Sequence, residues 1–513
     1  MSNNKSKGEE RKMTDLIPEF KKIDFGYASA QAEARENPDL LIKGYLDLHN
    51  ISDRVVNGRE WLILGHKGSG KSAIAERLRL IYEDDPLHFV NVVNIEDFEY
   101  VKFSKIVRSS EAIETELPTA WSWLLYAYLL NSFFRDQGVQ VDIPEEYEQV
   151  KSAFAEMGLS PVFDLNTIVR VSSENSFQLT IPKFAEQKWT KKTETAQVDI
   201  RWFIYNLRPF ISNIRSQSKH LLIIDGLDDI LATSATQYAS IGALVFEVHR
   251  INDFLKKNYV PAKVVMLCRT DIFQLLSGAN KNKIRQDYAI DLDWNSNPKA
   301  PDKSLLVRIG NLRAEISLDA KTDVASRYLP RRIEGKSALK MLLDMTRHTP
   351  RDYLQLLSYI QTSAESIPIA IDEMRNGIRE YSAKYFLPEI HDEMDGYASL
   401  DEIKGITEAI EQIAKRDFSY EELQKSAKDI GWSVPDEALE KVLRVLYECS
   451  AIGNVRVQRR GGRRFLSYKY RNRNSHFKRN ERIILHRGLW RAFNIQWEPF
   501  SPDIDPDVSS DDA

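Results

Sequence analysis

The chain has 513 residues, of which 42% are hydrophobic, and its formal net charge at pH 7 is −4. This length can bury two or three hydrophobic cores, and the near-balanced charge singles out no class of partner. Two cysteines, Cys268 and Cys449, are too few for a disulfide framework or a cysteine metal cluster. The most apolar run, 121–134, is shorter than the roughly 20 residues of a membrane span. We therefore expect a soluble cytoplasmic protein with no membrane partner.

The N-terminal quarter of the sequence predicts the beginning of a parallel sheet. A flexible arm is expected over residues 1–25, followed by helical segments over 29–37 and 40–53. A buried strand at 60–64 then runs into a glycine-rich loop and an amphipathic helix over 72–82. A Val-rich strand follows at 88–95. The order strand, loop, helix, strand is typical of an α/β fold whose parallel sheet carries helices on both faces.

The next predicted strand comes only after a long insertion, over about 96–197. This insertion contains a predicted helix at 118–135 and a predicted hairpin at 168–181. Beyond it, the pattern of apolar residues predicts further helices and strands of the same sheet. In chain order these are a helix over 200–216, a strand over 221–224, a helix over 238–258, and strands over 264–268 and 287–292. We assign residues 26–300 to one α/β core.

Two smaller domains are expected after the core. Residues 301–395 are predominantly helical and form a predicted lid. Residues 400–495 follow the plan of a winged helix, with three helices before two strands joined by the turn 459–462. The expected elements are helices over 403–414, 420–429 and 435–449 and strands over 453–458 and 464–470. The acidic tail, 496–513, is expected to be disordered.

The glycine-rich loop has the sequence of a P-loop, the phosphate-binding motif of many nucleotide-binding proteins. Its glycines allow backbone N–H groups to surround phosphates, and the helix that follows directs its positive dipole end at the same anions. Lys71 is expected to contact the β and γ phosphates, and Ser72 to ligate Mg²⁺. ATP or GTP, together with Mg²⁺, is therefore the predicted cofactor, and the choice of ATP follows only from the resemblance given below. The predicted nucleotide-binding residues are Gly65, His66, Lys67, Gly68, Ser69, Gly70, Lys71, Ser72 and Ala73. His66 and Lys67 occupy variable positions and receive no individual role.

A run of aspartates after a buried strand supplies the candidates for metal binding and hydrolysis. Asp225 ends the strand 221–224, where a carboxylate beside a P-loop holds the Mg²⁺ shell. Hydrolysis also needs a carboxylate that orients the attacking water. Asp228 and Asp229 are both candidates for that base, and the sequence does not choose between them.

Three arginines are candidates for sensing the nucleotide. Arg269, followed by Thr270 at the end of the strand 264–268, is placed to reach the γ-phosphate, although an arginine there also simply caps a strand. Arg351 opens a lid helix, where it can couple hydrolysis to lid motion, and a positive charge is otherwise unfavourable at that position. Arg285 is a candidate arginine finger toward a neighbouring subunit, with a solvated basic loop as the simpler explanation.

The C-terminal module is strongly basic. Between residues 451 and 495 there are 13 Lys and Arg residues and one acid, Glu481. Such a density suits contacts with phosphates, made through Arg459, Arg460, Arg463 and Arg464 of the hairpin. The start of the third helix, however, carries Asp436, Glu437 and Glu440, which would repel DNA in the major groove. Contact with a DNA backbone and binding of a protein both remain open.

These motifs together resemble known ATPases. The segment 221–229 is similar to the Walker B motif of NACHT-type STAND ATPases, except that Asp229 replaces their usual Glu, and Arg269 is similar to their sensor-1 arginine. Thr349-Pro350-Arg351 resembles sensor 2 of AAA+ ATPases, including origin-recognition types that end in a winged helix. The P-loop, with Phe25-Gly26 and Ala32-Glu33 upstream, resembles a bacterial P-loop ATPase family common in antiviral loci.

The resemblance implies a switch. ATP binding would close the lid, promote homo-oligomer assembly or signal to an effector such as a nuclease encoded nearby, and slow hydrolysis would reset it. The implied setting is bacterial antiphage defence. The alternative is a DNA-acting ATPase of initiator, loader or transposition-helper type. A second alternative is a scaffold that holds ATP without hydrolysing it.

Overall fold

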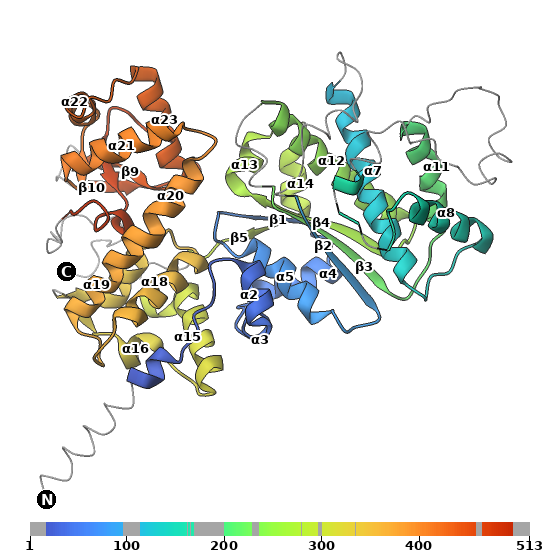
Figure 1. Ribbon diagram of the computed structural model, residues 1–513, viewed down its shortest axis with the longest axis horizontal. Helices are drawn as coiled ribbons and strands as arrows, with labels where there is room; N and C mark the ends of the chain where they lie inside the picture. Colours follow the sequence, from blue (N-terminus) through green and yellow to red (C-terminus); the bar gives the residue numbers. More distant parts are fainter. Residues whose placement is uncertain are drawn as a thin grey trace, which may run out of the picture. The chain divides into compact units, whose positions relative to one another are not determined.

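The computed structural model divides into two compact units (Figure 1). It describes residues 17–95, 113–161, 163–164, 166–168, 200–227, 235–276, 278, 280–295, 300–333, 335–457 and 464–495. The sheet unit comprises Asp47–Gly65 and Lys71–Leu292. The lid unit comprises Met1–Leu46, His66–Gly70 and Asp293–Ala513. The domain boundary expected at residue 26 therefore differs from the observed division, because residues 26–46 and the P-loop tip 66–70 group with the lid.

The sheet unit is built on five parallel strands. They are β1 (Leu62–Gly65), β2 (His88–Asn94), β3 (Lys219–Asp225), β4 (Ala262–Arg269) and β5 (Ala289–Leu292). Their order is β2-β3-β4-β1-β5, so β4 lies between the P-loop strand and the strand that ends in Asp225. The predicted parallel α/β sheet is confirmed, with strand limits within a few residues of those expected.

Both faces of this sheet are covered at its centre, which explains why β1 and the middle of β4 are apolar and buried. Leu62 and Leu64 belong to a core formed with the helices α7 (Ile113–Arg135) and α12 (Ala235–Lys257), whereas Ile63 is buried outside that cluster. The alternation follows from the two-residue repeat of a strand. The helix α5 (Lys71–Ile81) contacts the sheet on the other side (Figure 1). Further helices of the unit are α4 (Ile51–Asn57), α8 (Pro144–Glu156), α11 (Ile200–Ser212), α13 (Thr270–Leu275) and α14 (Lys281–Tyr288).

The insertion forms part of the connection between β2 and β3. Its helix α7 packs on α12 and is fixed there by Trp121, whose Nε1 donates to the carbonyl and hydroxyl oxygens of Ser240, both at 3.1 Å. The helix α8 was not expected from the sequence. The predicted hairpin at 168–181 lies, apart from Ile168, outside the described residues.

The N-terminal segment packs against the lid, so the expected flexible arm is wrong for residues 17–25. Phe20, Ile23 and Phe25 are buried, and residues 17–21 are helical. The expected helix over 40–53 is also wrong as one element. The chain forms α2 (Ala30–Glu36), α3 (Pro38–Lys43) and the short helix η1 (Leu48–Asn50) before α4. The break has a local cause, since His49 and Asn50 adopt positive φ angles of 53° and 54° that no continuous helix allows.

The rest of the lid unit consists of a helical lid and a winged-helix domain, both as expected. The lid contains η2 (Pro301–Lys303), α15 (Leu305–Leu318), α16 (Val324–Tyr328), β6 (Arg332–Ile333), β7 (Lys336–Ser337), α17 (Ala338–Asp344), α18 (Pro350–Ser363), α19 (Ile371–Tyr381), the π-helical turn η3 (Ser382–Phe386) and α20 (Leu387–Met394). The winged helix contains α21 (Leu400–Ile413), β8 (Asp417–Phe418), α22 (Tyr420–Asp429), α23 (Asp436–Glu448), β9 (Ile452–Val457), β10 (Arg464–Ser467), β11 (Arg482–Leu485) and η4 (Arg487–Leu489).

The sheet of the winged helix has more strands than the sequence indicates. Its order is β10-β9-β11-β8, with each neighbouring pair antiparallel. The strand β8 is too short for any periodic signal, and β10 ends at Ser467, three residues earlier than expected. The turn 459–462 lies outside the described residues. Across the described part of the chain, no helix has the length and apolar character needed to cross a membrane.

A buried ion pair fixes the N-terminal segment to the lid. Arg313 of α15 donates from Nη1 and Nη2 to the two carboxylate oxygens of Glu33, both at 2.7 Å, and from Nη1 to the carbonyl of Phe25 at 3.1 Å. Gly26 adopts φ +88°, and a Cβ there would lie 1.8 Å from Arg313 Nη1 and 2.1 Å from Glu33 Oε2. Only glycine fits at this position.

Replacing Gly26 with alanine should therefore break the Glu33–Arg313 pair and lower the free energy of unfolding by about 3–5 kcal/mol. Gly431→Ala is the matched control, because Gly431 also has a positive φ (+80°) but open space around its Cβ position. The free energy of unfolding of the control should fall by only about 1–2 kcal/mol, the cost of a left-handed backbone conformation at alanine. Equal losses in urea unfolding of the two variants would contradict this explanation.

Candidate nucleotide-binding site

In the sheet unit, the end of β1 and the start of α5 place the predicted phosphate-binding lysine. Lys71 is only 7% exposed, and its Nζ donates to the carbonyl of Gly65 at 3.4 Å. Ser72 and Ala73 follow in the first turn of α5. That helix contacts β3, which ends at the buried Asp225. Lys71, Ser72 and Asp225 thus belong to the same end of the sheet, as the motif requires.

The tip of β4 lies at this same edge. Gly65 pairs in register with Arg269, and Ile224 pairs with Met266. Because β4 separates β1 from β3, its last residues lie between the P-loop strand and the aspartate strand. The structure therefore brings Arg269 to the position expected for a residue that senses the γ-phosphate.

The side chain of Arg269 is engaged by a nearby acid. Its Nε and Nη2 donate to the two carboxylate oxygens of Asp271, at 3.1 and 2.7 Å. Next to it, Thr270 is 1% exposed, and its hydroxyl has no hydrogen-bond partner among the described residues. A buried hydroxyl in that state costs free energy unless a ligand satisfies it.

In the lid unit, the tip of the P-loop is bonded to the start of α18. The backbone N–H of Arg351 donates to the carbonyl of Gly68 at 3.3 Å. The approach is close: a Cβ on Gly68, where φ is +77°, would lie 3.2 Å from both Thr349 Oγ1 and Arg351 Cβ. Trp294 adds a second bond from its Nε1 to the carbonyl of Ser69 at 2.9 Å. The loop tip is thus held by backbone contacts as well as side chains.

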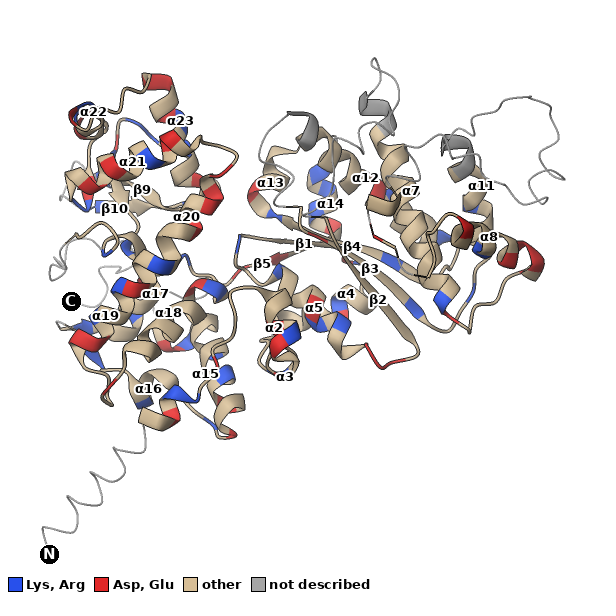
Figure 2. Ribbon diagram, viewed as in Figure 1, with Lys and Arg blue, Asp and Glu red and all other residues tan. Residues whose placement is uncertain are grey.

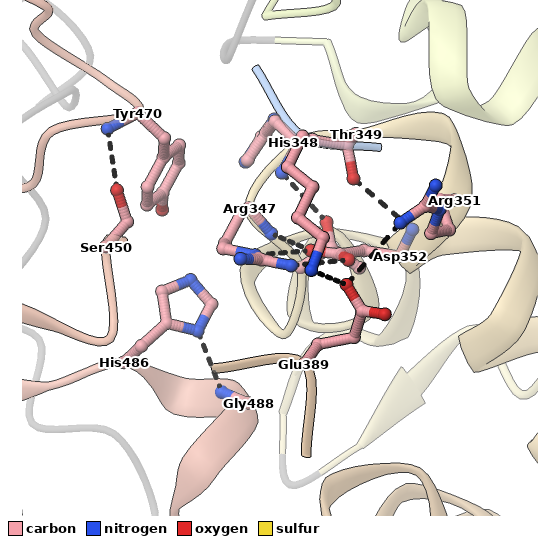
Figure 3. Close-up of polar contacts among 12 residues, drawn as sticks. Arg347, His348, Thr349, Arg351, Asp352, Glu389, Ser450, Tyr470, His486 and Gly488 are labelled. Atoms are coloured by element: carbon pink, nitrogen blue, oxygen red, sulfur yellow. Dashed lines mark hydrogen bonds and ion pairs between the residues drawn. The ribbon is translucent and has the colours of Figure 1, made fainter. Parts of the chain in front are cut away.

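One carboxylate of α20 serves two cations at this contact. Glu389 Oε2 lies 3.4 Å from the Nζ of Lys67 and 3.5 Å from the Nη1 of Arg351 (Figure 3). The three side chains are 24%, 28% and 17% exposed for Lys67, Arg351 and Glu389. Sequence reasoning did not identify Glu389, because no local motif marks it and its partners come from distant parts of the chain. Lys67, to which the sequence assigned no individual role, has an ionic partner in the lid.

A buried polar network lies beneath this contact (Figure 3). Arg347 donates to both carboxylate oxygens of Asp352, at 3.0 and 3.2 Å, and pairs with Glu393 of α20. Tyr385 donates to Asp352 Oδ1 at 3.0 Å. Burial opposes the ionisation of Asp352, but the charge and hydrogen bonds of Arg347 hold the pKa of that carboxyl below its usual value. The start of α18 is therefore anchored by a satisfied ionic cluster.

The network continues into the winged helix through aromatic stacking and one aspartate. The ring of His348 stacks on Tyr470 at 5.5 Å, and Phe386 stacks on His486 at 5.0 Å. Asp344 of α17 accepts from two arginines of the winged helix, Arg471 at 3.2 Å and Arg487. Within the lid unit, the segment that holds the P-loop tip is thus packed directly on the C-terminal domain.

The basic character of the C-terminal module is largely neutralised inside the lid unit. Seven of its ten described Lys and Arg residues form ion pairs: Lys469, Arg471, Arg473, Lys478, Arg479, Arg482 and Arg487. Arg456 and Arg464, which flank the hairpin turn, form no ion pair with described residues. Arg459, Arg460 and Arg463 lie outside the described residues. The dense run of positive charge is therefore not a single exposed phosphate-binding face.

The acidic start of α23 is also engaged. Asp436 accepts from Arg479, Tyr420 and Gln424, and Glu440 pairs with Arg444 and Arg479. Each of α21, α22 and α23 begins with two acidic residues in its first turn (Figure 2). The expected repulsion of DNA is thus weakened at Asp436 and Glu440 but not removed from the domain.

The remaining predicted residues lie as follows. Asp228 and Asp229 are outside the described residues, so the choice of base stays open. Arg285 of α14 donates to both carboxylate oxygens of Asp291, at 3.0 and 3.2 Å, so any reach toward a neighbouring subunit would require this pair to open. No group of three or more His, Cys, Asp or Glu in the described part of the chain could hold a metal.

The residues present fit a phosphate ligand. Ser69 is 2% exposed, and its hydroxyl has no hydrogen-bond partner, like that of Thr270. Gly68 and Gly70 have positive φ angles, 77° and 93°, as in backbone turns that bind anions, and the N–H of Ser69 between them donates to the carbonyl of His66 at 3.1 Å. The buried hydroxyl of Ser69 is the donor in this loop that a bound phosphate would satisfy.

A second polar cluster in the sheet unit has the composition of a hydrolytic triad but not its properties. Ser132 Oγ lies 2.8 Å from His220 Nδ1, and His220 Nε2 lies 3.2 Å from Asp136 Oδ2. Ser132 is 3% exposed, and burial lowers the pKa of His220 to about 4. The two ring nitrogens are also used in the opposite sense to the serine-protease arrangement. The cluster joins α7 to β3 and carries no substrate site.

The fold is that of an α/β P-loop NTPase, followed by a helical lid and a winged-helix domain. The strand order, the P-loop after β1 and the aspartate at the end of β3 carry this assignment.

The sequence matches no protein-family model, and a search of curated proteins gave no match. Among solved structures, the chain is similar to the Orc1 protein of Aeropyrum pernix in complex with DNA, with 13% identity and a TM-score of 0.40. That match covers 89% of this chain and 94% of the other. The chain is also similar to Cdc6p from Pyrobaculum aerophilum, with 14% identity, a TM-score of 0.31, and coverage of 92% and 98%. We draw neither an activity nor a partner from similarity at this level.

The buried His348 predicts a loss of stability in acid. Burial and the charge of Arg471 lower the pKa of His348 to about 4, against the opposing influence of Asp344, Asp293 and Asp352. The unfolded chain therefore binds a proton near pH 6.5 that the folded chain binds only near pH 4. Stability should fall as pH decreases through this window, by about 2 kcal/mol between pH 7 and 5 for this residue.

The test is urea unfolding at pH 7 and pH 5. His348→Asn should shrink the acid loss by about 2 kcal/mol, because asparagine tolerates the positive φ of 55° and does not titrate. Replacing the exposed His476 in the same way is the control. An unchanged pH dependence in His348→Asn would show that this ring is not the group responsible.

Proposed function

We propose that this protein is an ATP-dependent switch that binds ATP with Mg²⁺ and hydrolyses it. The observation that carries the proposal is the hydrogen bond from Arg351 of the lid to Gly68 of the P-loop, at 3.3 Å. A loop that must surround phosphates is bonded to the first turn of a lid helix. Any change of the loop on binding nucleotide therefore acts directly on that helix.

Each residue of the site has a proposed role. Lys71 binds the β and γ phosphates, and Ser72 and Asp225 hold Mg²⁺, which neutralises the charge that develops on the phosphate oxygens. Asp228 or Asp229 orients the attacking water. Arg269 senses the γ-phosphate, for which it must exchange its bond to Asp271. Arg351 reports the same phosphate to the lid.

The downstream partner stays a prediction. Assembly into a homo-oligomer through Arg285, an effector such as a nuclease, and a setting in antiphage defence rest on sequence resemblance. The switch itself is supported by the lid contacts, and it does not depend on which of these partners is correct.

Lys71→Met should weaken ATP binding about 10- to 100-fold, because it removes a charged donor from the phosphates. Titration calorimetry with ATP and Mg²⁺ measures the loss. Lys256→Met, a change of the same kind at an exposed position of α12, is the matched control. Equal affinities of wild type and Lys71→Met would contradict the proposed site.

Steady-state turnover of the same proteins separates a hydrolase from a scaffold. Asp228→Asn and Asp229→Asn identify the base, since only the residue that orients water should lower kcat with little change in ATP affinity. ATP binding by the wild type without any turnover, alone or with DNA, would favour the non-hydrolysing scaffold.

A DNA-acting ATPase is the second candidate function. The specific observation is at the hairpin, where Arg456 and Arg464 form no ion pair with described residues, and the neighbouring Phe465 is 37% exposed. Since most other basic side chains of the domain are paired, contact with DNA would pass through the hairpin to the phosphate backbone.

Replacing Arg459, Arg460, Arg463 and Arg464 with glutamine should abolish salt-dependent DNA binding if this second function is correct. Each lost phosphate contact should lower the slope of log affinity against log salt by about 1. The control removes four exposed lysines of the same domain, at Lys404, Lys425, Lys428 and Lys441. Fluorescence anisotropy with a labelled duplex measures both. Unchanged DNA affinity in the arginine variant would remove the main support for this function.

A further inference from the structure

We propose that Glu389 is a positioning residue that restrains Lys67 and Arg351 and competes for them with a nucleotide phosphate. The inference rests on the proposed ATP-dependent function and identifies the group that the γ-phosphate must displace. It concerns a residue of α20, outside every nucleotide-binding motif of the sequence.

The geometry shows a carboxylate shared between two cations. The same oxygen, Glu389 Oε2, lies 3.4 Å from Lys67 Nζ and 3.5 Å from Arg351 Nη1. Charge-assisted hydrogen bonds with a single partner are shorter, about 2.7–2.9 Å. Glu389 therefore holds both cations without fully satisfying either, and each keeps donors that a second anion can use.

Both cations lie at the P-loop. The anion that pairs with them therefore affects how the loop binds a nucleotide. Lys67 belongs to the loop itself, and the backbone N–H of Arg351 donates to the carbonyl of Gly68. Two positive side chains kept this close repel each other unless an anion lies between them. Glu389 is such an anion, and a triphosphate supplies another.

The helix that carries Glu389 is itself firmly held. One turn further along α20, the buried Glu393 pairs with Arg347, which also binds Asp352 of α18. Before α20, Phe386 stacks on His486 of the winged helix. Glu389 is therefore a fixed carboxylate against which a phosphate must compete, and not a mobile surface acid.

The carboxylate of Glu389 competes with ATP more than with ADP. ATP offers its γ-phosphate to Lys67 and Arg351, and each gains a full charge-assisted bond when it leaves Glu389. ADP lacks that phosphate and leaves the Glu389 contact in place. Glu389 thus lowers the affinity for ATP more than that for ADP, and it makes release of the lid depend on the third phosphate.

The test compares ATP and ADP affinities of the full chain by titration calorimetry. Glu389→Gln keeps the shape and removes the charge, so ATP should bind about 10-fold more tightly while the affinity for ADP changes less than about 2-fold. Glu389→Asp retains the carboxylate and should return the ratio of the two dissociation constants toward the wild-type value. Asp392→Asn makes the same charge change at an exposed position of α20 and is the matched control.

The outcomes distinguish the two proposals. A structural role of Glu389 alone would change the melting temperature and leave the ATP-to-ADP ratio as in wild type, and that result overturns the inference. Weaker ATP binding by Glu389→Gln overturns it as well, because the carboxylate would then assist binding. If the wild type and Asp392→Asn bind neither nucleotide, the proposed function fails, and the inference fails with it.

Discussion

The hydrogen bond between Arg351 and Gly68 is the contact on which the organisation of the lid unit depends. It joins the phosphate-binding loop to the helix α18. The start of this helix is capped, because Thr349 Oγ1 accepts from the N–H of Asp352 at 3.3 Å. The carboxylate of Asp352 is in turn buried against Arg347. The loop tip therefore lies on a preorganised platform whose position cannot change without disturbing several ionic contacts.

The basic residues of the C-terminal domain are mostly paired with acidic residues of the lid unit. The sequence of the C-terminal domain suggests a basic surface for nucleic acid, but most of its described arginines and lysines neutralise acids of the same unit. Asp344 binds two arginines, and Arg479 bridges Asp436 and Glu440. Counting charges along a chain overestimates a surface potential whenever the opposite charges come from distant segments. Among the described residues of the hairpin, Arg456 and Arg464 form no ion pair.

Two groups of polar residues at the nucleotide site differ in how completely they are satisfied. The cluster of Arg347, Asp352 and Glu393 is buried and fully paired, as a rigid structural element must be. By contrast, the buried hydroxyl of Ser69 in the lid unit has no hydrogen-bond partner among the described residues, and the same holds for Thr270 in the sheet unit. Buried donors of this kind suit a binding site, because a ligand can supply the missing hydrogen bonds.

The sequence by itself determined the elements of the sheet, the P-loop and the position of Asp225, because strand periodicity and glycine spacing are local properties of the chain. It also predicted the lid and the three helices of the winged helix. It failed where the cause was not local. The segment 17–25 was expected to be part of a flexible arm, yet it is buried by packing on the lid. Only the tertiary structure could reveal Glu389, since its partners Lys67 and Arg351 come from remote segments, and a shared ion pair is decided by folding and not by sequence spacing.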